Sequence, residues 1–151
     1  DIHYLLGDVY FANKEIDKAL AAYKKVLVLK PKTPGLFAKV GNIYMLKKNL
    51  SNAEFMYEQA VNESPNDVTL LLNYANILLA NKNAEKALEI AKKAISINDD
   101  PEAYFTLATI YETKDDTSLA LEYYKKAKEK GSKQAGIEEK INALNNSMEA
   151  F

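Results

Sequence analysis

Small residues recur along the chain at a nearly constant spacing, and this period constrains the fold more than any other feature. Spacings of 34, 34 and 33 residues separate four of them: Gly7, Gly41, Ala75 and Ala108. Alanines follow twelve residues later, at Ala19, Ala53, Ala87 and Ala120. Four residues further on, a third column holds Tyr23, Tyr57, Ala91 and Tyr124. A period of this length with helical spacing inside it predicts a stacked array of helices.

Each period is expected to hold two antiparallel helices. In the second period, Phe37, Val40 and Tyr44 flank the small residue at spacings of three and four, which places them on one helix face. We expect the Gly and Ala columns to let two helix backbones approach closely. Polar residues predict the turns within the pairs, at Asn13-Lys14, Lys47-Lys48-Asn49, Asn81-Lys82-Asn83 and Lys114-Asp115-Asp116. Prolines mark the boundaries between periods, at Pro31, Pro34, Pro65 and Pro101.

Composition argues against several classes of function. Of 151 residues, 48% are hydrophobic, which favours an ordered domain over disorder. The net charge is −1 and all 20 basic residues are lysine, so we expect no nucleic-acid partner. The chain has no cysteine, which excludes disulfides and thiol chemistry but does not indicate a compartment. No apolar run approaches the roughly 18 residues of a membrane helix, so no membrane insertion is expected.

The pattern resembles the tetratricopeptide repeat (TPR) family. The second period carries nearly the whole family pattern, with Phe37, Val40, Gly41, Tyr44, Ala53, Tyr57, Ala60 and Pro65. The third period departs most, with Leu78 and Ala91 in place of aromatic residues, and the fourth has Ser132 in place of the last proline. Over about residues 2–132, the resemblance implies an all-α, right-handed α-solenoid of antiparallel helix pairs.

We expect one solenoid domain with repeats at 1–33, 34–67, 68–100 and 101–133, and a capping helix over 134–151. An apolar stripe at helical spacing predicts that this last helix packs backward on the fourth repeat: Ile137, Ile141, Leu144 and Met148. Asn142 and Asn145 occupy the columns that would otherwise receive a further helix. Arrays of this kind need such a polar end for solubility.

The first residues form an edge that nothing earlier in the chain covers. Ile2 and Val9 occupy the columns of Leu36 and Ile43, which are expected to pack on the preceding repeat. The chain also begins inside a helical pattern without a methionine. We therefore expect a piece of a longer protein, whose targeting signals cannot be read. The alternatives are that the apolar pair is tolerated at the end or buried by self-association.

The sequence offers no catalytic, metal or cofactor site. His3 has no second histidine or cysteine to share a metal with. The acidic pairs Asp99-Asp100 and Asp115-Asp116 lie at expected helix starts, where carboxylates cap the backbone. Gly7 and Gly41 are packing glycines and belong to no phosphate loop. We expect no enzyme activity, no metal and no cofactor.

In the TPR family, the first helix of each pair lines a concave groove that binds peptides or partner helices. The resemblance places Asn42, Asn73 and Asn76 in this groove, where an amide can pair with both N–H and C=O of an extended peptide. Lys39 and several apolar residues complete the expected site: Tyr4, Phe11, Met45, Leu72, Leu79 and Phe105. The alternative is that the amides are solvated and the apolar residues belong to the core.

Some members of the family grip a C-terminal carboxylate with two asparagines and several basic residues. Asn42 and Asn73 match those asparagines, but the basic columns hold Ala38, Glu102 and Thr106. We therefore predict no such clamp. The expected function is a protein-interaction scaffold for an unknown protein or peptide, as a monomer or weak homodimer. The alternatives are a structural scaffold that self-assembles through Ile2 and Val9, or the recognition domain of a larger enzyme or secretion or assembly factor.

Overall fold

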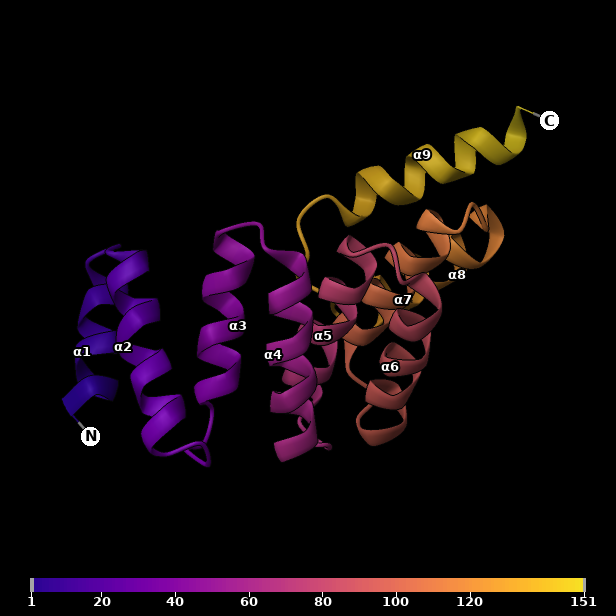
Figure 1. Ribbon diagram of the computed structural model, residues 1–151. Coiled ribbons are helices and arrows are strands. Elements are labelled where there is room, and N and C mark those ends of the chain that lie inside the picture. The colour runs from indigo at the N-terminus through magenta and orange to yellow at the C-terminus, as the bar shows by residue number, and fades with distance from the viewer. Residues whose placement is uncertain (1, 151) are drawn as a thin grey trace. The chain divides into compact units, whose positions relative to one another are not determined.

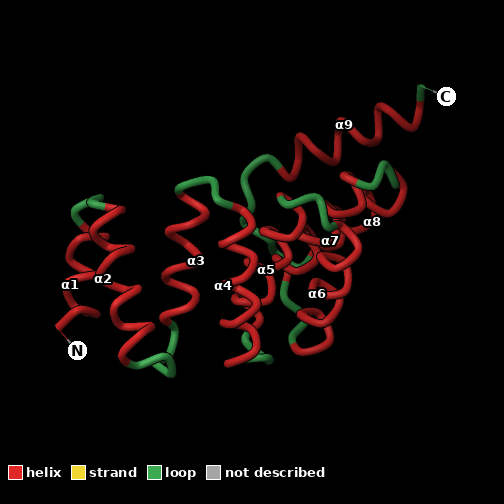
Figure 2. Tube along the Cα trace, viewed as in Figure 1, coloured by secondary structure: helices red, strands yellow, loops and turns green. Residues whose placement is uncertain are grey.

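The computed structural model describes residues 2–150, which form nine helices and no strand (Figures 1 and 2). The expected all-α class is confirmed. The helices fall into two compact units, and the boundary between them along the chain lies between Ser64 and Pro65. The N-terminal unit holds α1 (Ile2–Ala12), α2 (Ile16–Leu29), α3 (Leu36–Leu46) and α4 (Leu50–Glu63). The C-terminal unit holds α5 (Val68–Ala80), α6 (Ala84–Ile97), α7 (Pro101–Thr113), α8 (Thr117–Glu129) and α9 (Ile137–Glu149).

Within each unit, consecutive helices pack as pairs, and the pairs stack. In the N-terminal unit α1 packs on α2, α3 on α4, and α2 on α3. In the C-terminal unit α5 packs on α6 and α7 on α8, while α6 and α5 both contact α7. The small residues and the second alanines are buried at these contacts, so the period of the sequence is the period of the packing.

The glycines of the first two repeats make room for an aromatic ring. A Cβ on Gly7 would lie 2.4 Å from Cε1 of Tyr23, and one on Gly41 would lie 2.6 Å from Cδ2 of Tyr57. Such distances are far inside van der Waals contact, so the tyrosine of the second helix lies directly over the glycine of the first. The aromatic column thus fills the gap between the two helices at the point where the glycine leaves room for it.

A left-handed residue joins the two helices of every pair. Lys14, Lys48, Lys82 and Asp115 have φ angles of 62°, 56°, 63° and 60°. The next residue returns its N–H to a carbonyl five residues earlier, as Asn49 does to Tyr44 over 2.9 Å. This bond satisfies carbonyls that the helix end would otherwise leave free. The turns lie where the polar residues predicted them, although glycine, the usual residue for this conformation, is absent from all four positions.

Side-chain caps fix where most of the helices begin. Asn49, Asn83 and Asp116 each accept a hydrogen bond from the N–H three residues later, over 3.2, 3.3 and 3.1 Å. Asp100 accepts from the N–H of Glu102 over 2.8 Å, with Pro101 in the first turn. Asp100 and Asp116 are thus capping residues, as the acidic pairs at helix starts predicted.

The last helix covers the end of the C-terminal unit through only part of its apolar stripe. Ile137 and Ile141 are buried with Tyr124 and Ala127 of α8, and Leu144 packs at the margin of this cluster. Met148, in contrast, is 48% exposed. The expectation that all four stripe residues pack backward is therefore wrong for Met148, which lies in the last turn of α9, beyond the cluster.

At the opposite end of the repeat pattern, the first helix leaves its apolar edge in solvent. Ile2 is 70% exposed and Val9 is 53% exposed, whereas Leu36 and Ile43, in the same columns of the next repeat, are fully buried. The difference arises because α2 packs on α3 and no described helix packs in the same way on α1.

Candidate peptide-binding clefts

The first cleft lies in the N-terminal unit and has a volume of about 160 Å³. Residues of α1, α2 and α3 line it: Asp8, Phe11, Ala12, Tyr23, Lys39 and Asn42. Three of the predicted site residues, Phe11, Lys39 and Asn42, are therefore neighbours here.

Asp8 binds the other charged group of the first cleft. The Tyr23 hydroxyl and the Lys39 ammonium group both donate to Oδ1 of Asp8, and the ammonium nitrogen also lies 4.6 Å from the ring centre of Tyr4. Burial alone would raise the pKa of Asp8, but the bonds from Lys39 and Tyr23 outweigh it and lower that pKa. Burial and the same carboxylate raise the pKa of Tyr23. The positive charge of Lys39 is thus matched within the chain.

The residue after each small residue meets a tyrosine hydroxyl wherever the repeat carries that tyrosine. The pairs are Tyr23 with Asp8, Tyr57 with Asn42 over 2.5 Å, and Tyr124 with Thr109 over 3.2 Å. In the first cleft this leaves the Oδ1 atom of Asn42 bonded within the chain. Its amide N–H groups are the part of this predicted site residue that a ligand can still use.

The second cleft lies in the C-terminal unit, between α5 and α7, and has a volume of about 340 Å³. That volume is at the lower end of the range of about 300–1,000 Å³ common for ligand sites, and the first cleft is below it. Most of the lining comes from one face of each helix: Val68, Thr69, Leu72, Asn73 and Asn76 of α5, and Glu102, Phe105, Thr106 and Thr109 of α7. Asp100 and Gln134 complete the rim.

Asn76 differs from its counterparts because no tyrosine lies opposite. The third repeat has Ala91 in the tyrosine column. Ala91 lies on α6, which packs on α5, and it is fully buried. Asn73 precedes Asn76 by one helical turn, and both side chains are exposed in the cleft. Among residues 2–150, neither amide has a hydrogen-bond partner. Both therefore keep their full capacity to donate and accept.

Glu102 supplies the negative charge at one end of the second cleft. Its Oε1 atom accepts from the Ser132 hydroxyl over 2.9 Å and from the Lys133 N–H over 3.2 Å. Its Oε2 atom is buried and has no hydrogen-bond partner among the described residues. A carboxylate oxygen in that state is unfavourable unless a donor approaches it.

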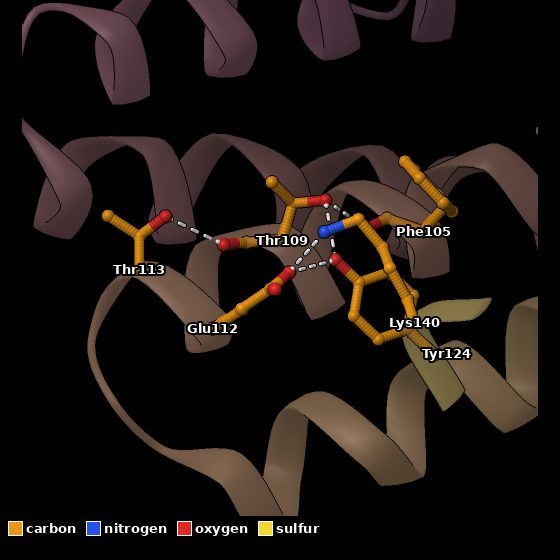
Figure 3. Close-up of polar contacts among 6 residues, drawn as sticks. All are labelled: Phe105, Thr109, Glu112, Thr113, Tyr124 and Lys140. Carbon is orange, nitrogen blue, oxygen red and sulfur yellow. Dashed lines mark hydrogen bonds and ion pairs between the residues drawn. The ribbon is translucent and has the colours of Figure 1, made fainter. Parts of the chain in front are cut away.

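A polar network beside the second cleft connects α7, α8 and α9 (Figure 3). Oε2 of Glu112 accepts from the Tyr124 hydroxyl over 2.5 Å and from the Lys140 ammonium group over 2.7 Å. Thr109 lies next to them and donates to the Phe105 carbonyl over 3.1 Å. Burial would raise the pKa of Glu112, but Lys140 and Tyr124 lower it. This network holds Thr109 and Phe105 in place along the cleft and leaves its charges matched.

Sequence models of known families account for most of the chain. Two models described as tetratricopeptide repeat match residues 44–111 and 101–129, and a model described as TPR repeat matches residues 7–48. The chain belongs to the tetratricopeptide repeat family. A comparison with curated proteins gave no significant match.

Solved TPR structures share this fold at low sequence identity. A segment of MamA from Desulfovibrio magneticus RS-1 is 15% identical, with a TM-score of 0.87 over 98% of this chain and 84% of that one. YrrB, described as a TPR protein with an unusual peptide-binding site, is 21% identical, with a TM-score of 0.78 over 97% of this chain and 76% of that one. TTC0263 from Thermus thermophilus is also 21% identical, with a TM-score of 0.73 over 94% and 79%.

The predicted site residues fall into three groups: those that line the first cleft, those that line the second, and those that line neither. Phe11, Lys39 and Asn42 line the first cleft, and Leu72, Asn73, Asn76 and Phe105 line the second. Tyr4 packs edge-to-face on Tyr23, with 5.9 Å between ring centres. Met45 and Leu79 are half-buried and line neither cleft. The three asparagines thus belong to two units, and a single groove through all of them stays a prediction.

Asp8 is one of the lining residues that the sequence argument missed. The signal was available, because Asp8 directly follows Gly7 in the column that holds Asn42 and Asn76 in later repeats. An acidic residue in an otherwise amide and hydroxyl column indicates a nearby cation, and Lys39 is that cation.

Two further classes of site were searched for in residues 2–150. No group of three or more His, Asp or Glu side chains is arranged there to hold a metal ion. None of the helices in that range has both the length and the apolar character needed to span a bilayer.

Proposed function

We infer that this TPR chain is a protein-interaction module that binds an extended peptide segment in the second cleft. The observation that carries the proposal is the pair Asn73 and Asn76, two exposed amides without internal partners in a cleft with apolar walls. Exposed amides by themselves are common, but here Leu72 and Phe105 line the same cleft. The combination offers polar contacts for a backbone and apolar surface for side chains.

The chemistry of the cleft suits a peptide backbone better than a particular side chain. Each amide can donate to a carbonyl and accept from an N–H group of the ligand. Asn73 and Asn76 are one helical turn apart on α5, about 5 Å along its axis. That separation lies within reach of two consecutive backbone groups of an extended chain, whose residues rise about 3.3 Å each. Side chains on one face of the peptide would then contact Leu72 and Phe105.

One relative supports this assignment by its description alone. YrrB, which shares the fold, is described as having a peptide-binding site. At 21% identity, the similarity shows a shared fold but does not show a shared ligand. The proposal therefore depends on the lining of the second cleft.

The test starts from a display library of short linear peptides panned against the chain. Kd values of the enriched peptides are then compared between wild type and Asn73→Ala/Asn76→Ala. We expect about 30-fold weaker binding, because two hydrogen bonds of roughly 1 kcal/mol each are lost. Asn142→Ala/Asn146→Ala, two exposed amides on α9, is the matched control. Unchanged binding in the cleft variant, or equal loss in the control, would refute the proposal.

Self-association through α1 is the second candidate function. Ile2, Leu5 and Val9 are all more than half exposed, whereas Leu36 and Ile43 of the next repeat are buried by a neighbouring helix. A second copy of the chain could cover this edge in the same way. Sedimentation across a range of concentrations, with Val9→Lys as the comparison, tests it. A wild-type chain that stays monomeric at every concentration would rule it out.

A further inference from the structure

The second cleft has two carboxylates at one end and no cationic side chain in its lining. The carboxylates are those of Glu102 and Asp100. Asp100 is engaged through Oδ1 as the cap of α7, and Glu102 lies in the first turn of that helix; the helix N-terminus offsets part of the charge of both. Glu102 is bonded only through Oε1. Its Oε2 atom is buried, and no cation of the cleft lining balances the carboxylate, so its charge acts on the cleft from within the wall.

Three lysines of the C-terminal unit, Lys130, Lys133 and Lys140, are engaged elsewhere or exposed. Lys130 forms an ion pair with Asp99, and Lys140 pairs with Glu112. Lys133 contacts Glu102 through its backbone N–H, and its side chain belongs to an exposed residue. In the first cleft, by contrast, Lys39 is bound directly to Asp8. Both clefts lie between the first helices of successive repeats, and only the first contains its own counter-charge.

We propose that the second cleft selects peptides carrying a lysine or arginine side chain next to the segment bound by Asn73 and Asn76. The cation would lie at the Glu102 end and supply the charged partner that the carboxylate lacks. This inference rests on the peptide-binding function proposed above and adds the class of ligand. It is the reverse of carboxylate capture, which needs basic residues in columns that hold Glu102 and Thr106 here.

Glu102→Gln is a sharp probe because it removes the charge and keeps the shape. The amide oxygen can still accept from Ser132 and Lys133, so the connection between α7 and the segment before α9 remains. Glu122→Gln changes the net charge by the same amount at an exposed position of α8 outside the cleft lining. Thermal unfolding of both variants checks that neither change disturbs the fold.

The probes are three pools of fluorescein-labelled peptides with acetylated and amidated ends. All pools share a central leucine in an otherwise random uncharged sequence, and they differ only in one flanking residue: lysine, glutamine or glutamate. Fluorescence anisotropy should give about tenfold tighter binding for the lysine pool than for the glutamine pool, with the glutamate pool weakest. Added salt should reduce the lysine advantage. Glu102→Gln should abolish it, and Glu122→Gln should retain it.

Each other outcome overturns a defined part of the argument. Equal binding of all pools, lost in Asn73→Ala/Asn76→Ala, would leave the peptide cleft standing and refute the charge selection. A lysine preference that survives in Glu102→Gln would also refute it. Binding that is indifferent to Asn73→Ala/Asn76→Ala would refute the peptide cleft itself, and the charge selection with it.

Discussion

The first and second clefts each lie between the first helices of two successive TPR repeats, yet the polar groups that line them differ in how far they are bonded within the chain. In the first cleft, Asp8 binds Lys39 and Tyr23, and Asn42 accepts from Tyr57. In the second, Asn73, Asn76 and Oε2 of Glu102 have no partner among the described residues. Polar groups bonded within the chain must give up those bonds to contact a ligand, whereas exposed groups without internal partners exchange only water for it. The comparison therefore supports the proposal that ligands bind in the second cleft.

The free state of Asn76 has its origin in two columns of the repeat, the small residue and the tyrosine of the second helix. The first two repeats combine a glycine with a tyrosine that lies over it, and that tyrosine hydroxyl reaches the residue after the glycine. The third repeat combines Ala75 with Ala91, both fully buried. The helices still pack, but the hydroxyl is gone and Asn76 is released. A packing change between two helices thus alters the chemistry of the neighbouring cleft.

The largest expected effect follows from removing that tyrosine where it is present. Tyr57 is 2% exposed and fills the space above Gly41. Tyr57→Ala should lower the free energy of unfolding by about 3–5 kcal/mol, as for other large-to-small changes in a core. Tyr57→Phe keeps the ring and should cost only about 1 kcal/mol, the worth of the hydroxyl bond to Asn42. Urea titration followed by circular dichroism measures both; similar losses in the two variants would contradict the packing role.

Converting the third repeat to the pattern of the second should weaken peptide binding in the second cleft. Ala75→Gly/Ala91→Tyr provides both the ring and the space for it, and the new hydroxyl would face Asn76 as Tyr57 faces Asn42. We expect peptides selected on wild type to bind about threefold to tenfold more weakly, since one amide of the pair becomes occupied.

Ala75→Gly alone is the control for this conversion. It should cost about 1 kcal/mol of stability through helix propensity and leave peptide binding unchanged. Full peptide affinity in a folded double variant would show that occupation of Asn76 does not govern binding.

The sequence predicted the helix pairs, their turns and the last helix, because each of these depends on local patterns. The polar turn residues fall where the left-handed residues lie, and Ile137 and Ile141 pack as the stripe indicated. The columns also showed that Ala91 departs from the aromatic pattern. They did not show its consequence, because it depends on how far a tyrosine hydroxyl reaches across a helix pair.

The sequence argument did not predict pairings between polar groups that are far apart in the sequence. Lys39 and Asp8 are 31 residues apart, and Ser132 and Glu102 are 30 apart. Each pairing depends on the register between helices of different repeats, which local periodicity does not define. Met148 is the converse case. It lies on the apolar stripe that the sequence indicated, but it is 48% exposed and does not belong to the cluster formed by Ile137 and Ile141.

Acid should weaken the two units through matching ion pairs, Asp8 with Lys39 and Glu112 with Lys140. The pKa of each carboxylate is lowered in the folded chain, from ordinary values of 3.8 for Asp and 4.5 for Glu. Each pair therefore stabilises the fold above the ordinary pKa, and this contribution is lost as the pH falls through the lower, folded pKa.

Removing a carboxylate measures the size of this contribution. Because the side chains are more than a third exposed, Glu112→Gln should cost less than about 1 kcal/mol at neutral pH. The difference from wild type should disappear in urea titrations as the pH falls below the lowered, folded pKa of Glu112. A difference that is independent of pH would assign the effect to packing instead of charge.

The smallest expected effect concerns the turns within the helix pairs and compares Lys48 in the N-terminal unit with Asp115 in the C-terminal unit. Both adopt a positive φ, which costs most residues about 1–2 kcal/mol and glycine almost nothing. Glycine also makes the unfolded chain more flexible, which offsets part of the gain. Lys48→Gly should therefore raise the free energy of unfolding by about 0.5 kcal/mol, and Asp115→Gly by less, because Asp tolerates this conformation better than Lys. Lys47→Gly, at a φ of −81°, should be destabilising; a gain there equal to that of Lys48→Gly would show that backbone strain is not the cause.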